Sequence, residues 1–143
     1  MAAYNKFQDF VEQLGLAKHA FGTHVFKVVL SNSAPVATNT ILANITQISN
    51  ANGYTTGGID AQVTWAEVTG TATATGTMVT WTCVTAPMGP FEYVVLYNDT
   101  QTSPADPLVG WWDYGSALTL QVGETFSVKF NNSPTTGAIF TLT

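Results

Sequence analysis

The 143-residue sequence contains no arginine, and its four lysines, Lys6, Lys18, Lys27 and Lys129, are scattered through a chain of formal net charge -5. Proteins that bind nucleic acids cluster Lys and Arg, because their affinity comes from neutralising phosphates and releasing counterions. Four dispersed lysines do not form such a cluster. We therefore expect no nucleic-acid partner.

Charge of either sign is scarce, since charged residues make up 9% of the chain, against about 25% in an average soluble protein. Thr, Ser, Asn, Gln and Gly take their place. A neutral polar surface gives weak electrostatic repulsion between copies of the protein, and it suits a protein that is packed against others. The single Cys83 excludes an internal disulfide, and we predict that it is a small buried hydrophobic residue.

The chain has no apolar run that approaches the length of a membrane span. The first residues include Lys6 and Asp9 and no apolar segment of the kind found in signal peptides. These absences predict a protein that is synthesised in the cytoplasm and has no membrane partner.

Ionisable residues that are able to carry out catalysis are few. His19 and His24 lie five residues apart with no Cys nearby, and we interpret them as surface or strand-start histidines that hold no metal. Asp99, Asp106 and Asp113 lie near aromatic residues, as the paired carboxylates of a glycosidase do, but Asp is also a common turn residue. We expect no enzyme, no cofactor and no metal site.

The first fifteen residues differ from the rest. Apolar residues recur from Phe7 to Leu14 at the i, i+3, i+4 and i+7 positions of a helix, with Asn5 as a candidate N-cap and Gly15 as a stop. So short a helix is marginal alone. It either covers an open end of the protein or packs on a neighbouring subunit.

From residue 23 onward, extended segments with alternating apolar residues follow one another with short polar turns between them. The strands that we predict are 23–30, 63–68, 78–84, 91–98, 108–114, 117–122, 125–130 and 138–142, with a weaker segment at 70–76. The pattern predicts an all-β, jelly-roll-like antiparallel β-sandwich of about eight strands with a short N-terminal amphipathic helix. We expect one domain, 1–143, made of a helix or arm at 1–15 and a β-sandwich at 23–143.

Three features refine this prediction. Segment 91–98 has apolar residues on both faces and is expected to be a central strand that is covered on two sides. The connection 35–58 is long, contains one apolar cluster that predicts a helical turn, and is expected to be a contact surface. Gly123 and Glu124 are expected to form a two-residue hairpin turn between 117–122 and 125–130.

Trp111 and Trp112 are adjacent, so on a strand they point to opposite faces. Three interpretations stay open. Trp112 faces outward with Tyr114 as an anchor for a protein partner, or the two rings form a platform for a sugar, or the strand is central and both tryptophans are covered.

Four segments resemble, in their amino-acid sequences and in their order, a family of small virion structural proteins of tailed bacteriophages. They are 27–35, 52–58, 91–100 and 107–115. The resemblance runs from the N-terminal helix almost to the C-terminus. It implies a capsid cement, or decoration, protein with a jelly-roll fold, which sits on the outside of the capsid and clamps neighbouring subunits of the major capsid protein. Its implied partners are the major capsid protein and itself, as a homo-oligomer, dimer or trimer. Its implied location is the exterior of the virion capsid, after synthesis in the host cytoplasm.

Two other functions remain as alternatives: a structural component of a phage tail or appendage, and a carbohydrate-binding β-sandwich that uses Trp112 and Tyr114. Aromatic residues in the N-terminal segment, in the long connection and around the tryptophan pair are the candidates for the partner interface. They are Tyr4, Phe7, Phe10, Tyr54, Trp112 and Tyr114.

Overall fold

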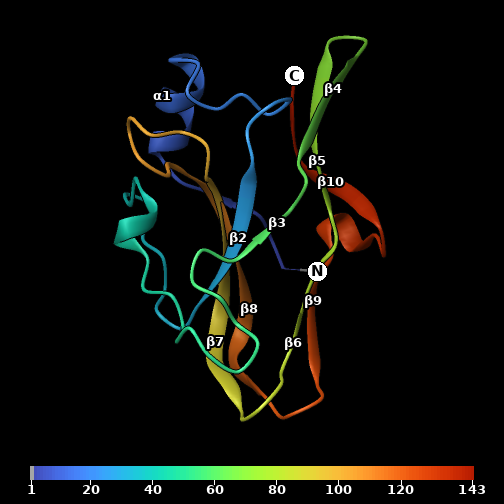
Figure 1. The fold of residues 1–143 in the computed structure, drawn as a ribbon. Coiled ribbons are helices and arrows are strands. Elements are labelled where there is room, and N and C mark those ends of the chain that lie inside the picture. The colour runs from blue at the N-terminus through green and yellow to red at the C-terminus, as the bar shows by residue number, and fades with distance from the viewer. Residues whose placement is uncertain (1) are drawn as a thin grey trace.

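A computed structural model describes residues 2–143 of the chain, whose regular elements are mostly antiparallel strands (Figure 1). The elements in chain order are β1 (Asn5–Lys6), α1 (Asp9–Gly15), β2 (Phe26–Ser31), a 3₁₀ turn (Leu42–Asn44), β3 (Ile59–Asp60), β4 (Thr64–Val68), β5 (Thr71–Thr77), β6 (Val79–Thr82), β7 (Met88–Asn98), β8 (Leu108–Leu120), β9 (Thr125–Val128), a second 3₁₀ turn (Phe130–Asn132) and β10 (Thr136–Leu142). No helix in this part of the chain has the length and apolar character needed to cross a membrane.

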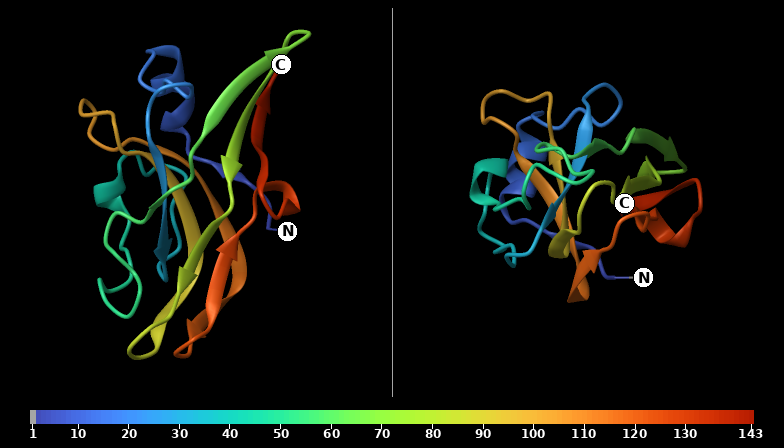
Figure 2. Two further views of the ribbon diagram at one scale, coloured as in Figure 1. Left: turned by 45° about the vertical axis from the view of Figure 1, so that its right-hand side comes forward. Right: turned by 60° about the horizontal axis from the view of Figure 1, so that its bottom comes forward.

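The strands form two layers (Figure 2). One layer is a five-stranded sheet in the order β1-β8-β7-β2-β3, and the other consists of the sheets β10-β5-β4 and β6-β9. Met78 alone separates β5 from β6, so a single extended segment passes from one of the smaller sheets to the other. The prediction of an all-β antiparallel sandwich is confirmed, whereas jelly-roll connectivity stays a prediction.

The centre of the five-stranded sheet is covered on both faces, as predicted for segment 91–98. On β7, Val94 and Leu96 point into the main core, and Val95 and Tyr97 point into a smaller cluster on the opposite face. The alternation of a strand sends successive side chains to opposite faces, so a strand that is apolar at every position needs two covers. Burying each such side chain contributes roughly 1.5–3 kcal/mol.

The N-terminal segment is only partly helical, so the predicted helix was too long. Helix α1 spans seven residues, and before it β1 pairs with β8, where Asn5 lies opposite Trp111. At the start of the helix the Gln8 amide donates to the Ala37 carbonyl over 2.9 Å, which satisfies one of the backbone groups that a helix leaves open there. On the helix, Phe10 is buried against Phe21 and Phe140. The helix therefore covers one end of its own sandwich.

The predicted hairpin around Gly123 is wrong. Strand β8 belongs to the five-stranded sheet and β9 pairs with β6 in the other layer, so the two strands are not hairpin partners. The Glu124 amide donates to the Gln121 carbonyl over 2.9 Å, which closes a turn with φ of 90° at Gly123. This turn carries the chain from one layer to the other. The predicted strands 108–114 and 117–122 are one strand, β8, with an irregularity between them.

The long connection 35–58 packs on the outer face of the five-stranded sheet. It contains the 3₁₀ turn at Leu42–Asn44, near the expected helical turn, and Leu42 and Ile45 join the cluster around Val95. At Gly58 the backbone has φ of +72°, and a Cβ there would collide with the Val28 carbonyl. Part of this connection therefore covers the core, which limits the contact surface expected there.

Candidate functional site: an open groove beside β9

Four of the six aromatic residues expected at a partner interface are interior residues. The exposed fractions are 0% for Phe7, 5% for Phe10, 2% for Tyr54 and 6% for Trp112. Each ring lies on the inward side of its segment, where burial of its large apolar surface is favourable. They do not serve as exposed anchors, so this part of the prediction is wrong.

The other two candidates, Tyr4 and Tyr114, differ from each other. Tyr4 is half-buried: its ring lies 5.5 Å from that of Trp112 and its hydroxyl donates to the Val109 carbonyl over 3.3 Å. Burial raises the pKa of the Tyr4 phenol. Tyr114 is 55% exposed and is the candidate that reaches solvent.

The adjacent tryptophans follow the interpretation in which both are covered. Trp112 lies in the main core against Phe130, with ring centroids 5.6 Å apart. Trp111 points to the other face of the sheet, where it is partly buried against Phe7 at 4.5 Å. The expectation that Trp112 faces outward fails because β9 and the following 3₁₀ turn lie over its face of the sheet.

Just after Trp112, strand β8 bulges away from β7. The pairs Tyr93–Asp113 and Phe91–Leu118 leave residues 114–117 of β8 opposite Glu92 alone. The bulge is held by the Asp113 carboxylate, whose Oδ1 accepts from the amide of Gly115 over 2.7 Å, and by φ of 94° at Gly115. Bulges re-aim side chains and are frequent next to binding sites. Here the bulge brings the ring of Tyr114 next to that of Phe126 of β9, with the ring centroids 5.8 Å apart.

The bulge borders an open groove of about 440 Å³. Its floor includes Val94 and Trp112, which are register partners on the inner face of the five-stranded sheet. One wall is formed by every residue from 125 to 130, and Tyr114 and Ala2 complete the lining together with Asn132. A volume of this size lies within the range of ligand-binding pockets.

The electrostatics of the groove contrast with those of the whole chain. Lys129 is the charged residue in the lining, and no carboxylate lines the groove although the chain has 9 Asp and Glu. The indole N–H of Trp112 is buried and has no hydrogen-bond partner within residues 2–143. The groove therefore combines aromatic surface with one cation.

The interpretation of His19 as a surface residue is wrong, since it is 5% exposed. The Asn98 side-chain amide lies 3.3 Å from Nδ1 of His19 and 3.0 Å from Nδ1 of His24. Burial, and then the proximity of His24, lowers the pKa of His19 to about 4. No group of three or more His, Cys, Asp or Glu within residues 2–143 is arranged to hold a metal ion.

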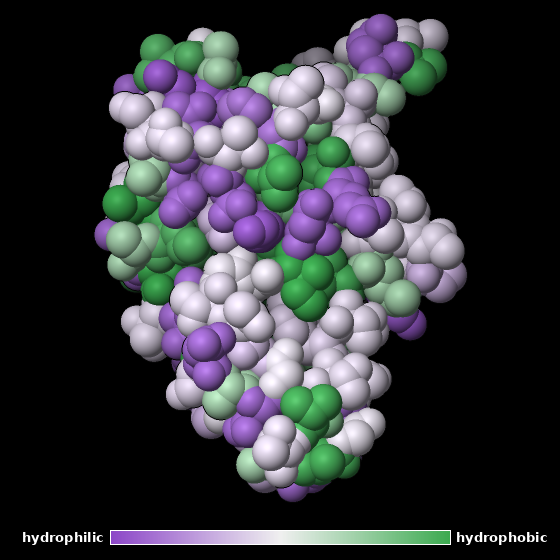
Figure 3. All heavy atoms as spheres, viewed as in Figure 1, coloured by the Kyte–Doolittle hydropathy of each residue, from purple (hydrophilic) through white to green (hydrophobic). Residues whose placement is uncertain are grey.

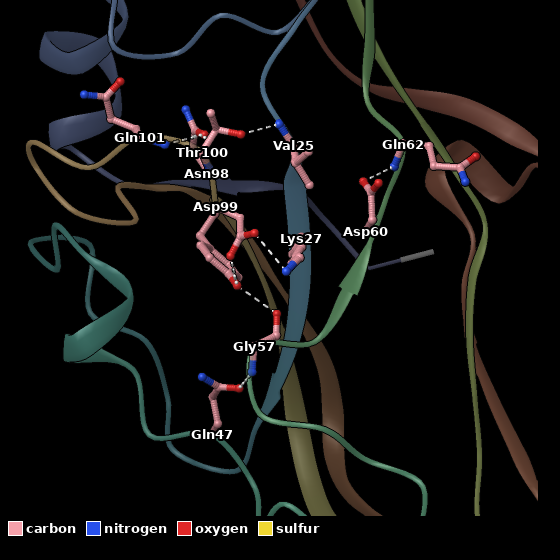
Figure 4. A network of polar contacts seen from close by, with 11 residues as sticks. Val25, Lys27, Gln47, Gly57, Asp60, Gln62, Asn98, Asp99, Thr100 and Gln101 are labelled. Atoms are coloured by element: carbon pink, nitrogen blue, oxygen red, sulfur yellow. Dashed lines mark hydrogen bonds and ion pairs between the residues drawn. The ribbon is translucent and has the colours of Figure 1, made fainter.

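A second polar cluster fastens the turn at residues 52–58 to the sheet (Figure 4). Lys27 forms an ion pair with Asp99 at 2.8 Å, and the Tyr97 hydroxyl donates to the Gly57 carbonyl over 2.8 Å. The Gly57 amide in turn donates to Gln47 over 2.9 Å. These contacts tie β2, β7 and the turn together, which gives Asp99 a local structural role.

The other two aspartates near the aromatic residues, Asp106 and Asp113, lie in different environments. Burial, and then the negative charge of Asp99, raises the pKa of Asp106. Asp113 accepts from the backbone of the bulge in β8. Asp113 thus makes the kind of local backbone contact that Asp commonly makes in turns.

Comparisons with known proteins found no matching family model, no matching curated protein and no matching solved structure.

The sequence named Trp112 and Tyr114 but missed the wall that β9 forms. Alternation along 125–130 indicated that Phe126 and Val128 point inward and Lys129 outward. It does not indicate that β9 pairs with β6 alone, or that consecutive residues from 125 to 130 line a groove along its other edge. The one available signal was the break in apolar alternation at Gly115-Ser116, which marks the bulge.

Proposed function

We propose that this protein is a non-enzymatic structural protein of a tailed-bacteriophage virion, a cement or decoration protein that binds the outside of the capsid. It stabilises the shell by clamping neighbouring subunits of the major capsid protein. Because it binds the assembled lattice and not the free subunits, it stabilises the lattice by mass action.

The observation that carries this proposal is the position of the four segments that resemble the phage family. Segments 27–35, 91–100 and 107–115 contain β2, β7 and β8, which are neighbours in one sheet. Segment 52–58 packs on the same sheet, where the Tyr54 hydroxyl accepts from the Leu30 amide over 3.3 Å. Four resembling segments that fold into one connected unit support a shared fold more strongly than four scattered matches do.

The surface is also suited to broad protein contacts. Residues of intermediate hydropathy are mixed with hydrophilic and hydrophobic ones over the face drawn in Figure 3, and charged residues are 9% of the chain. The β4–β5 hairpin projects beyond the rest of the molecule in the same view, and Val68 near its tip is 68% exposed. A projecting hairpin with an exposed apolar residue is the kind of element that reaches a neighbouring subunit.

Cryo-electron microscopy of the parent virion tests the location. We expect density for the sandwich on the outer surface of the shell, at contacts between capsid subunits. Density on the tail or an appendage would contradict the cement function and favour the tail alternative. Shells stripped of the protein and incubated with purified protein provide the second measurement, since binding should raise their melting temperature.

The proposed assembly as a dimer or trimer has its own test. Val11 and Leu16, on and just after α1, are 52% and 58% exposed, and an oligomer would cover them. Light scattering on the purified protein should give a mass two or three times 15.2 kDa. A monomer at high micromolar concentration would contradict assembly in solution.

A further inference from the structure

The wall that β9 contributes to the groove is the edge of a strand and not one of its faces. Successive residues of a strand point to opposite faces, so a wall made by one face would contain only alternate residues. Every residue from 125 to 130 lines the groove. Strand β9 pairs only with β6 within residues 2–143, so its second row of backbone N–H and C=O groups borders the groove.

The opposite side of the groove also ends in unpaired strand. Strand β1 pairs with β8 at Trp111 and Gly110 and extends no further along it in the described chain. Continuing this antiparallel register brings Ala2 toward Tyr114, and both residues line the groove. The groove therefore begins where β1 stops.

The two-stranded sheet β6-β9 is held by its packing, since Val79 and Trp81 of β6 are buried in the main core, but β9 has one edge without a partner strand within residues 2–143. Exposed strand edges accept further strands, and proteins normally protect them. The edge of β9 has no covering strand within residues 2–143, while Phe126, Val128 and Trp112 offer apolar surface beside it.

We infer that the groove accepts an extended segment of another polypeptide, which pairs with the edge of β9 and converts β6-β9 into a three-stranded sheet. Main-chain hydrogen bonds give such a strand its affinity, and alternate side chains placed in pockets give it specificity. Side chains on one face of the added strand lie over Trp112 and Val94. Lys129, in a lining without carboxylates, selects a segment that is neutral or acidic.

The donor of this strand is a segment of the major capsid protein; that identification rests on the proposed function, whereas strand addition does not. A sugar would use the rings of Tyr114 and Phe126 but has no repeating row of amide donors and acceptors to match an open strand edge. The open edge therefore favours a polypeptide over a glycan.

The first experiment measures strand addition on the isolated protein. The probe is a capped heptapeptide of alternating valine and threonine with one central glutamate, titrated into ¹⁵N-labelled protein. Amide shifts are expected at residues 125–129 and at the indole of Trp112. Two further peptides carry N-methyl groups on the odd or on the even residues, which removes N–H donors and leaves the side chains unchanged.

Only one row of amides in an added edge strand faces its partner. One methylated peptide should therefore lose about tenfold or more in affinity, while the other binds like the parent. Equal effects of the two peptides, shifts elsewhere in the protein, or no shifts at millimolar peptide would each overturn strand addition. Shifts at 125–129 produced by maltotriose or chitotriose, and not by the peptide, would overturn it in favour of a glycan site.

The second experiment tests the charge and the donor. Lys129→Glu should weaken the glutamate peptide by at least about threefold and improve binding of the same peptide with lysine in place of glutamate. Lys18→Glu makes the same charge change at a residue that does not line the groove, so it is the matched control and should change the binding of neither peptide. An unchanged peptide preference would overturn the role of Lys129.

On capsid shells, the same variants separate the two proposals. Wild-type protein that binds the peptide but not the shells would contradict the cement function and leave strand addition intact. If the wild type binds the shells, Lys129→Glu and Tyr114→Ala should bind them more weakly than the control Lys18→Glu. Equal binding by all three variants would overturn the capsid protein as the donor.

Discussion

The two halves of strand β8 have opposite environments although they belong to one continuous strand. Residues 108–112 have β7 on one edge and β1 on part of the other, and both their faces are covered by core clusters. Residues 113–117 are exposed, residues 114–117 bulge away from β7, and Tyr114 lines the groove. The first half holds the sandwich together, and the second half presents surface to solvent.

This difference arises from what surrounds each half. In the first half Gly110 lets Tyr4 and the backbone of Asn5 approach closely, because a Cβ at this position would collide with both. In the second half Gly115 has open space around it, and glycine is favoured there because the backbone has a positive φ. The same residue type therefore permits close packing in one half and a backbone bulge in the other.

The largest expected effect compares two aromatic residues on the same face of β8. Trp112→Ala should lower the free energy of unfolding by about 3–5 kcal/mol, because it removes a buried ring and leaves a cavity. Tyr114→Ala should lower it by no more than about 1 kcal/mol, since that ring is exposed and contacts mainly Phe126. Urea unfolding measures both. Similar losses in the two variants would contradict the division of the strand.

The pH dependence of stability tests the burial of His19. His19 has a pKa of about 4 in the folded protein and an ordinary value of 6.5 in the unfolded chain. Between these values only the unfolded state binds the proton, so stability should fall as pH falls from 6.5 to 4, by about 1.4 kcal/mol per pH unit.

Thermal or urea unfolding at a series of pH values measures this slope. His19→Gln removes the titrating ring, so the difference in stability between wild type and variant should shrink across the same pH range. Parallel pH profiles of the two proteins would show that His19 does not titrate between its folded and unfolded values.

A smaller effect is expected at the close contact between β1 and β8. Gly110→Ala should cost about 1–3 kcal/mol, because the added methyl group displaces Tyr4 or the strand β1. Gly22→Ala is the control, since nothing lies within 4 Å of a Cβ there and its φ is not positive. The Phe7 amide donates to the Val109 carbonyl of β8 over 3.3 Å, and its hydrogen exchange should accelerate in the first variant alone. Unchanged exchange would mean that β1 is held independently of this contact.

The smallest effect concerns the bulge. Asp113→Ala removes the acceptor for the Gly115 amide and should cost about 0.5–1 kcal/mol. Asp113→Asn keeps an oxygen at this position and should cost less. Faster hydrogen exchange of residues 114–117 in the alanine variant is the specific readout, and equal exchange in the two variants would mean that the carboxylate does not hold the bulge.

Much of the fold was predictable because strand alternation is local. The segments near β2, β4, β6, β7, β9 and β10 were identified, and so was the burial of Cys83, which is 1% exposed. The errors occurred where a partner distant in sequence decides the outcome. The helical pattern began at Phe7 with Asn5 as the candidate N-cap, but residues 5–6 pair with β8 and the helix begins at Asp9. The turn at Gly123 had a hairpin pattern but connects two layers.

The candidate site was predictable only in part, and for the same reason. Aromatic content pointed to Trp112 and Tyr114, but it did not separate a core ring from an exposed one. The two residues share a face of β8, and β9 lies over the first while the bulge turns the second outward. The other aromatic candidates were buried by elements far from them along the chain, as Phe7 is by Trp111.

By itself the sequence determined the periodicity, the neutral polar surface and the absence of arginine, because these depend on residues taken singly or with near neighbours. Only the tertiary structure decided that β9 has an unpaired edge, that Trp112 is buried and that a groove with Lys129 opens beside them. Burial and edge pairing are properties of two segments in contact. Whether a strand meets a partner is decided by how the layers stack, which the alternation within either strand does not specify.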